Sequence, residues 1–137
     1  MSEHSQPPRV GHQFRIWGQN LNKSLDAQID LLHHLSPNYF DLALLQEPCC
    51  DFRGLSRATR GFVSIYPPSH SRDPRASHLM ILVNTRLPAA SWRAVFIPSP
   101  NITAIDFFGE AFSTIRIINI YNNCDNNASL DVLRNFM

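Results

Sequence analysis

The sequence predicts one α/β domain, and three features of its pattern predict this class. An amphipathic helical segment lies between two strand-like segments near the start of the chain. Two short apolar runs, Leu42–Leu45 and Leu79–Val83, are typical of strands buried on both faces of a sheet. After residue 60, strand-like segments follow one another at the spacing of hairpins in a sandwich. With 137 residues, 44% of them hydrophobic and 17% charged, the chain can bury one ordinary core.

The first twelve residues differ from the rest in composition. They are polar and hold two prolines, so we expect a disordered lead-in over 1–12 and the folded domain over 13–137. This lead-in carries no secretory signal, and no apolar run approaches the ~18 residues that a membrane span requires. Three cysteines, two of them adjacent, favour a reducing compartment. We therefore expect an intracellular protein. Any longer protein of which this chain is a part could be nuclear.

The first elements are predicted from local signals. Phe14–Trp17 resembles a strand, and Gly18 with the polar residues after it ends the pattern. Ser24 is a suitable N-cap for a helix over Leu25–Leu35, whose apolar residues recur at helical spacing. Asp41–Gln46 follows as a strand with both faces buried.

The later segments predict successive strands and a closing helix. The strands are expected at 62–66, 79–83, 94–97, 102–108 and 114–121. Apolar residues on both faces of the last one indicate an interior strand. Ser129 is expected to cap a helix that has made barely two turns at Met137, which indicates a fragment of a longer protein.

Polar residues cluster after three of the predicted strands. Asn20 and Asn22 follow the first strand, Glu47 follows the second, and Tyr121, Asn122 and Asn123 follow the last. A carboxylate beside carboxamides suits Mg²⁺, which keeps several waters and takes one or two protein carboxylates. The alternative is that Glu47 is a solvated strand-end residue and that the asparagines serve the turns.

The combination of these segments resembles the endonuclease/exonuclease/phosphatase superfamily. Within this superfamily, the sequence is most similar to the endonuclease domain of LINE-type (non-LTR) retrotransposon polyproteins, especially fungal ones. The similarity lies at Ile16–Ser24, Leu44–Pro48, Met80–Asn84 and Ile117–Asn122. The resemblance runs over 13–137 and implies about the first half of that family's four-layer α/β sandwich.

The resemblance implies a role for each matching residue. Glu47 and Asn20 would hold a catalytic Mg²⁺ or Mn²⁺ and the scissile phosphate of DNA, and Tyr121 would hydrogen-bond the phosphate. Asn22 lies where the family often has Asp or Asn, although Lys23–Ser24 replaces the Gly-Leu that commonly follows. The asparagine usual three positions after the tyrosine is Cys124 here, with Asn122 and Asn123 as neighbouring substitutes for substrate contact.

Two motifs of the family have no counterpart in the 137 residues: a downstream Gly-Asp-x-Asn, which orients the attacking water, and a terminal Asp-His pair. The resemblance therefore implies part of a metal-dependent DNA endonuclease domain that is inactive alone. The alternative from another class is a non-catalytic remnant or nucleic-acid-binding module, and a phosphatase of the same superfamily is less favoured. No pattern indicates an obligate protein partner.

Other polar residues carry weaker signals. His70 and His78 flank a loop and are expected to be solvated rather than catalytic, and Asp106 is expected on a solvated strand face. The net charge is only +1, but seven arginines and a single acid lie between residues 53 and 93. This arginine-rich stretch fits phosphate contact and a solvated rim about equally well.

Overall fold

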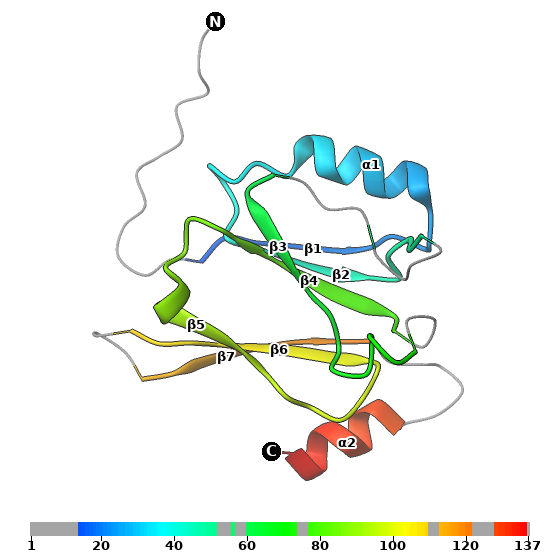
Figure 1. Cartoon of the computed structure of the whole chain (residues 1–137), viewed down its shortest axis with the longest axis vertical. Helices are drawn as coiled ribbons and strands as arrows, with labels where there is room; N and C mark the ends of the chain where they lie inside the picture. Colours follow the sequence, from blue (N-terminus) through cyan, green and yellow to red (C-terminus); the bar gives the residue numbers. More distant parts are fainter. Residues whose placement is uncertain are drawn as a thin grey trace, which may run out of the picture.

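The computed structural model describes residues 14–51, 56, 60–73, 77–109, 113–121 and 128–136. The predicted lead-in over 1–12 and the predicted substrate residues Asn122 and Asn123 lie outside this part of the chain. Within it, seven strands form two sheets, and two α-helices cover them (Figure 1). No helix among the described residues has both the length and the apolar composition needed to cross a membrane.

The first sheet has four strands in the order β1-β2-β4-β3. Their bounds are β1 Ile16–Asn20, β2 Leu42–Gln46, β3 Phe62–Ile65 and β4 Leu79–Asn84. β1 and β2 run parallel because helix α1, Leu25–His34, carries the chain back between them. The pairs β2–β4 and β3–β4 are antiparallel, so the sheet is mixed.

The second sheet has three antiparallel strands in the order β5-β6-β7. A short 3₁₀ helix, η2 at Ala89–Ser91, leads into β5, Trp92–Val95, which pairs with β6, Ile102–Phe107. β7, Ile115–Ile120, lies on the other side of β6, and α2 covers Ala128–Phe136. The two sheets face one another, with α1 outside the first and α2 outside the second (Figure 1).

Three apolar clusters hold these four layers together. One joins α1 to the outer face of the first sheet, through Leu31 and Leu35 against Ala43, Leu45, Met80 and Leu82. The second lies between the sheets and contains Leu42, Ile81, Val83, Ile105 and Phe107. The third joins the second sheet to α2, through Ile102 and Ala104 with Val132, Leu133 and Phe136. The predicted α/β sandwich is confirmed.

The first strand is longer and later than its sequence predicted. β1 continues through Gly18 to Asn20 because its backbone keeps pairing with β2, with Gly18 opposite Leu44. A strand at the edge of a sheet tolerates polar residues, since one side of its backbone faces away from the ladder. The predicted cap is confirmed, because Ser24 Oγ accepts the backbone N–H of Ala27 at 3.1 Å.

The prediction that the last strand is interior is wrong for the described sheet, in which β7 pairs with β6 alone. Its two apolar faces have a different cause. Ile117 belongs to the cluster between the sheets, whereas Ile118 and Ile120 belong to the cluster that the second sheet shares with α2. Burial of both faces of β7 therefore shows that other layers pack above and below it. It does not show that other strands pair with both of its edges. The helix α2 also begins before Ser129, the expected cap.

Candidate functional site

The ends of β1, β2 and β7 and the start of β4 lie together at one end of the sandwich, the right-hand end in Figure 1. β1 and β2 end there in register, with Asn20 opposite Gln46, as their parallel pairing requires. Glu47 follows β2 directly, and its backbone N–H donates to the carbonyl of His78, just before β4. Asn20 and Glu47 thus lie at the same end of the sheet, and the convergence of their side chains on one cation stays a prediction.

Glu47 lies in a strained backbone conformation. Its φ of 52° is in the left-handed region, which costs non-glycine residues of order 1 kcal/mol or more. Hydrogen bonds hold it there: its N–H meets His78 O at 2.7 Å and its carbonyl accepts the Lys23 N–H at 2.8 Å. Asn22 and Lys23, at φ 52° and 56°, share this conformation. Such strain clusters at functional sites, where surrounding contacts over-determine the backbone.

Tyr121 joins Glu47 across the two sheets. The Tyr121 hydroxyl donates to Glu47 Oε1 at 3.3 Å, although 74 residues separate them in sequence. The Tyr121 backbone N–H is bound to the carbonyl of Asn101 at 2.8 Å. Both side chains are half-buried, so the pair is packed against its neighbours yet reachable from solvent. The sequence prediction that Tyr121 belongs to this cluster is confirmed.

His78 and Asn101 are members of the cluster that the sequence did not predict. The ring of His78 stacks on Tyr121 with centroids 4.8 Å apart and an interplanar angle of 20°. Its Nδ1 lies 2.6 Å from Asn101 Oδ1, an oxygen that can only accept, so Nδ1 carries the proton in this arrangement. The expectation that His78 is a solvated loop residue is wrong, because its ring is half-buried between the sheets.

Two further amides fasten the second sheet to the first beside the site. Asn119 is only 4% exposed, and its Nδ2 donates to the carbonyls of Leu45 and Met80, both at 3.1 Å. Gln46 Nε2 donates to the carbonyl of Ile120 at 2.6 Å. These bonds fix the end of β7, and with it Tyr121, against the end of β2. The sequence around Asn119 and Gln46 does not indicate that these amides bond across the two sheets.

Asn20 and Asn22 are exposed and form part of the turn after β1. Asn20 Oδ1 accepts the backbone N–H of Asn22 at 2.9 Å, the turn role considered as an alternative from the sequence. The structure therefore brings Asn20 to the site end, while its amide oxygen serves its own turn. Metal binding by Asn20 and substrate contact by Asn22 stay predictions.

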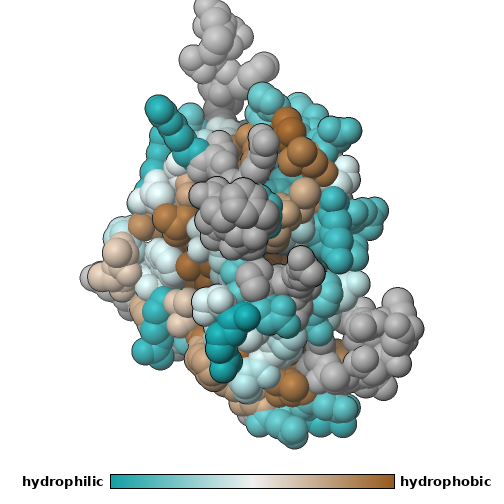
Figure 2. Space-filling model, turned by 45° about the vertical axis from the view of Figure 1, so that its right-hand side comes forward, coloured by the Kyte–Doolittle hydropathy of each residue, from teal (hydrophilic) through white to brown (hydrophobic). Residues whose placement is uncertain are grey.

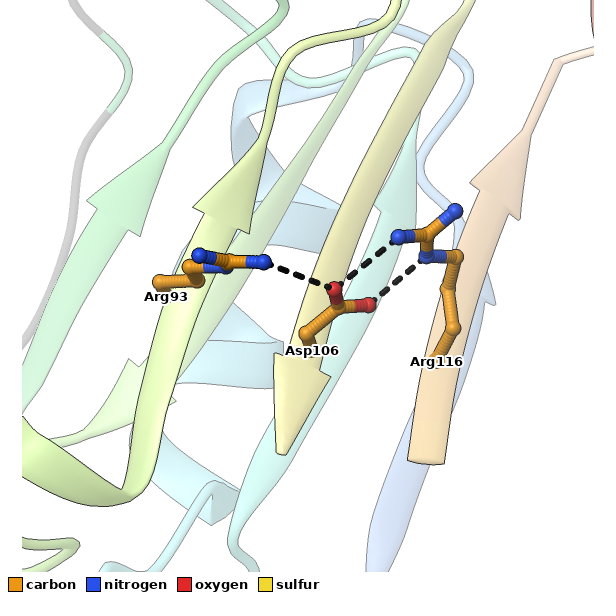
Figure 3. Close-up of polar contacts among 3 residues, drawn as sticks. All are labelled: Arg93, Asp106 and Arg116. Atoms are coloured by element: carbon orange, nitrogen blue, oxygen red, sulfur yellow. Dashed lines mark hydrogen bonds and ion pairs between the residues drawn. The ribbon is translucent and has the colours of Figure 1, made fainter. Parts of the chain in front are cut away.

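A second carboxylate, Asp106 in the middle of the second sheet, differs in its partners. Asp106 is 1% exposed, and Arg116 donates to both of its oxygens at 2.7 and 2.9 Å, with Arg93 at 3.9 Å (Figure 3). The hydrogen bonds from Arg116, with the charges of both arginines, lower the pKa of Asp106. The expectation of a solvated strand face was wrong here. Arg116 also lies over the Phe136 ring at 5.2 Å.

The arginine-rich stretch is partly described, and its described members lie at the surface. Arg60, Arg72, Arg86 and Arg93 are exposed, and Arg93 lies over the ring of Phe108 at 5.3 Å. Figure 2 shows one face of the molecule, on which hydrophilic side chains border smaller hydrophobic patches. Phosphate contact by these arginines stays a prediction.

The described residues at the site end offer few groups that could coordinate a metal ion. Among the described residues, no group of three or more His, Cys, Asp or Glu side chains is placed to hold a metal ion. Cys49 and Cys50 are free thiols, and burial is the main cause that raises the pKa of Cys50. Glu47 is the carboxylate that the described contacts place at this end, beside the Tyr121 hydroxyl.

No protein-family model matches this sequence, and no curated protein matches it either. Among solved structures, the comparison finds a similar fold in a retrotransposon endonuclease domain. That structure is the endonuclease domain of TRAS1, a telomere-specific non-LTR retrotransposon, with a TM-score of 0.64 and 18% sequence identity. The match covers 90% of this chain and 52% of that chain, so this chain spans about half the length of its structural neighbour. The likeness establishes the fold.

Proposed function

We propose that this chain carries the first part of a metal-dependent phosphodiesterase site of the DNA endonuclease type. The observation that carries the proposal is the contact between the Tyr121 hydroxyl and Glu47 Oε1, at 3.3 Å. It joins the ends of two strands from different sheets, on a fold similar to the TRAS1 endonuclease domain. Carboxylate, phenol and amides converging at strand ends suit the recognition of a phosphate diester and its cation.

The residues at this end fit a hard divalent cation. Glu47 is half-buried, and among the described residues no arginine or lysine side chain pairs with it. Mg²⁺ is held in many sites by one or two carboxylates, with waters and substrate phosphate completing its shell. Glu47, with Asn20 beside it, would hold Mg²⁺ or Mn²⁺. When bound, the ion would stabilise negative charge on the phosphate and the leaving oxygen.

The Tyr121 hydroxyl would act on the phosphate itself. A phenol donates one hydrogen bond, and here that bond goes to Glu47. A carboxylate that ligates a cation is a weaker acceptor, so the hydroxyl would turn its proton toward a phosphate oxygen. Asn22 at the β1 turn, with Asn122 and Asn123 after β7, would contact the flanking substrate.

The experiment compares DNA binding with and without the cation. A fluorescently labelled DNA duplex is titrated with the 137-residue chain in Mg²⁺ and in EDTA, followed by anisotropy. The proposal expects Mg²⁺ to tighten binding by the parent and to have no effect in Glu47→Gln, which keeps the shape of the side chain but removes its charge. Equal binding in all four conditions would contradict the site and favour a nucleic-acid-binding surface built on the arginines.

Cleavage is expected to be absent from the 137 residues taken alone. An aligned water and a partner for the developing charge are needed beside the metal, and groups that act together lose most of their rate when one is missing. Supercoiled plasmid incubated with the parent and Mg²⁺ should stay intact. Nicking by the parent that disappears in Glu47→Ala would show that the chain is competent and overturn the expected inactivity.

A further inference from the structure

We infer that His78 and Asn101 are positioning residues that hold the Tyr121 hydroxyl on the Glu47 carboxylate. The four residues form a closed ring of contacts, two from each sheet. Glu47 and His78 lie at the ends of β2 and β4, and Asn101 and Tyr121 at the ends of β6 and β7. The inference deepens the proposed function, and it rests on that function only where metal binding is concerned.

His78 touches both members of the Tyr121–Glu47 pair. Its carbonyl accepts the Glu47 N–H at 2.7 Å, which helps to keep the strained backbone of Glu47 in place. Its ring stacks on the Tyr121 ring at 4.8 Å. One residue therefore fixes the carboxylate through its backbone and the phenol through its side chain.

Asn101 closes the ring from the second sheet. Its Oδ1 lies 2.6 Å from His78 Nδ1, and its carbonyl accepts the Tyr121 N–H at 2.8 Å. The Asn101 backbone N–H donates to Ser99 Oγ at 3.1 Å, so the backbone of Asn101 is itself held in place. Asn101 thus fixes both the orientation of the His78 ring and the position of the Tyr121 backbone.

The hydroxyl–carboxylate bond needs this support. At 3.3 Å it is longer than the usual 2.7–2.8 Å for O–H···O, so it restrains the phenol weakly. Groups that bind a ligand or a cation are held in place by packing and by outer hydrogen bonds. The stack and the His78–Asn101 bond supply that restraint for the two side-chain torsions of Tyr121.

A second histidine–tyrosine stack provides a matched control. His70 lies on Tyr66 with centroids 3.9 Å apart and an angle of 5°. There the tyrosine hydroxyl accepts the backbone N–H of Ser56 at 2.9 Å, whereas the Tyr121 hydroxyl donates to the Glu47 carboxylate. Comparison of the two stacks separates a general effect of losing a histidine ring from an effect on the site.

The test reads the environment of each tyrosine directly. The chain has three tyrosines, so labelling with 3-fluorotyrosine gives resonances that Tyr→Phe variants assign. We expect His78→Ala and Asn101→Ala to move the Tyr121 resonance toward its position in the urea-unfolded chain, and His78→Phe, which keeps an aromatic ring, to move it less. His70→Ala should move Tyr66 and leave Tyr121 unchanged.

An unchanged Tyr121 resonance in a folded His78→Ala or Asn101→Ala chain overturns the inference. If His78→Ala does not fold, Asn101→Ala and His78→Phe decide, with circular dichroism checking the fold of each.

A metal arm separates this inference from the proposed function. Mn²⁺ affinity of the parent should fall about tenfold in Tyr121→Phe, as for other residues that support a ligating carboxylate. If His78 acts through Tyr121, adding His78→Ala to Tyr121→Phe costs no further affinity, whereas an additive loss contradicts that route. If Mn²⁺ does not bind at all while His78→Ala still moves Tyr121, the proposed function fails and the positioning inference stands.

Discussion

Asp106 and Glu47 lie in opposite electrostatic environments. The difference distinguishes a carboxylate that stabilises the fold from one that is suited to bind a cation. Asp106 is buried on the second sheet, and two arginines from the neighbouring strands balance its charge (Figure 3). Glu47 is half-buried at the site end, and its side chain receives a bond from the neutral Tyr121 hydroxyl. A carboxylate whose charge the described protein leaves unbalanced is the one suited to bind a cation.

The backbone of Asp106 is regular, whereas that of Glu47 is strained. Asp106 occupies a regular strand position paired with Arg116, so its carboxylate is held by ordinary sheet geometry. Glu47 has a φ of 52°, which disfavours every residue except glycine, asparagine and aspartate. The positive φ of Glu47 costs stability that regular sheet structure does not require, and its carboxylate meets the Tyr121 hydroxyl.

The largest expected effect comes from the ion pair of the buried Asp106 carboxylate with Arg116. Replacing Arg116 by methionine leaves the Asp106 carboxylate, 2% exposed, with Arg93 alone at 3.9 Å. Because Arg116 is itself 40% exposed, the loss should be that of a buried carboxylate deprived of its main hydrogen-bond donor, about 2 kcal/mol of unfolding free energy. Urea denaturation measures the loss. Arg93→Met is the matched control, since that side chain is 70% exposed and should cost less than about 0.5 kcal/mol. Equal losses in both variants would contradict the assignment of Arg116 as the main partner.

Acid should weaken the fold through Asp106. Its pKa lies below the ordinary 3.8 in the folded chain, because Arg116 and Arg93 stabilise the charged form. The stabilisation is therefore complete above the unfolded pKa and is lost as the pH falls through the lowered folded value. Unfolding free energy measured from pH 6 to pH 2 should drop below about pH 4 in the parent. Asp106→Asn should be less stable at pH 6 and less sensitive to acid; a parallel acid curve would argue against this origin.

Glu47→Gly should leave the fold as stable as the parent or more stable, by about 1 kcal/mol. Glycine adopts a positive φ without penalty, and the described partners of the Glu47 side chain contribute one long hydrogen bond. Gly61, at φ 89°, is the opposite case: an added Cβ would meet Pro37 Cβ at 3.0 Å, so Gly61→Ala should destabilise. Thermal melts compare the two. A large loss in Glu47→Gly would mean that this residue is structural.

Tyr121→Phe should have a small effect on stability, about 0.5 kcal/mol, since the bond it removes is long and half-exposed. Asn119→Ala removes two bonds of a buried amide between the sheets and should cost more. If the order were reversed, Tyr121 would serve the packing of the sheets and not the site.

The parts of the fold that the sequence predicted are those with local signals. Ser24 begins α1 where its side chain caps the helix, and the apolar run at β2 marks a strand buried on both faces. The end of β1 was missed, because Gly18 through Asn20 owe their strand to pairing with β2 and not to their own side chains. α2 begins at Ala128, one residue before the predicted cap, and is held by Val132, Leu133 and Phe136, which pack against the second sheet.

The site was predicted in part for the same physical reason. Glu47 and Tyr121 follow strands directly, and a residue at a strand end is placed by the sheet that the strand joins. His78, Asn101 and Asn119 have partners 23 to 74 residues away, determined by how the two sheets pack. Hydrophobic periodicity says which face of a strand is buried, but it does not say which residue of another sheet lies opposite.

We expect the Glu47 carboxylate, with which no described arginine or lysine pairs, to bind a divalent cation, and the Asp106 carboxylate, which pairs with two arginines, not to bind one. Mn²⁺ titration of the 137-residue chain, with free Mn²⁺ followed by electron paramagnetic resonance, tests it most directly. The account predicts one ion per chain, displaced by excess Mg²⁺, with an affinity that falls at least about tenfold in Glu47→Gln and is unchanged in folded Asp106→Asn. Mn²⁺ binding that survives Glu47→Gln at full affinity would contradict it.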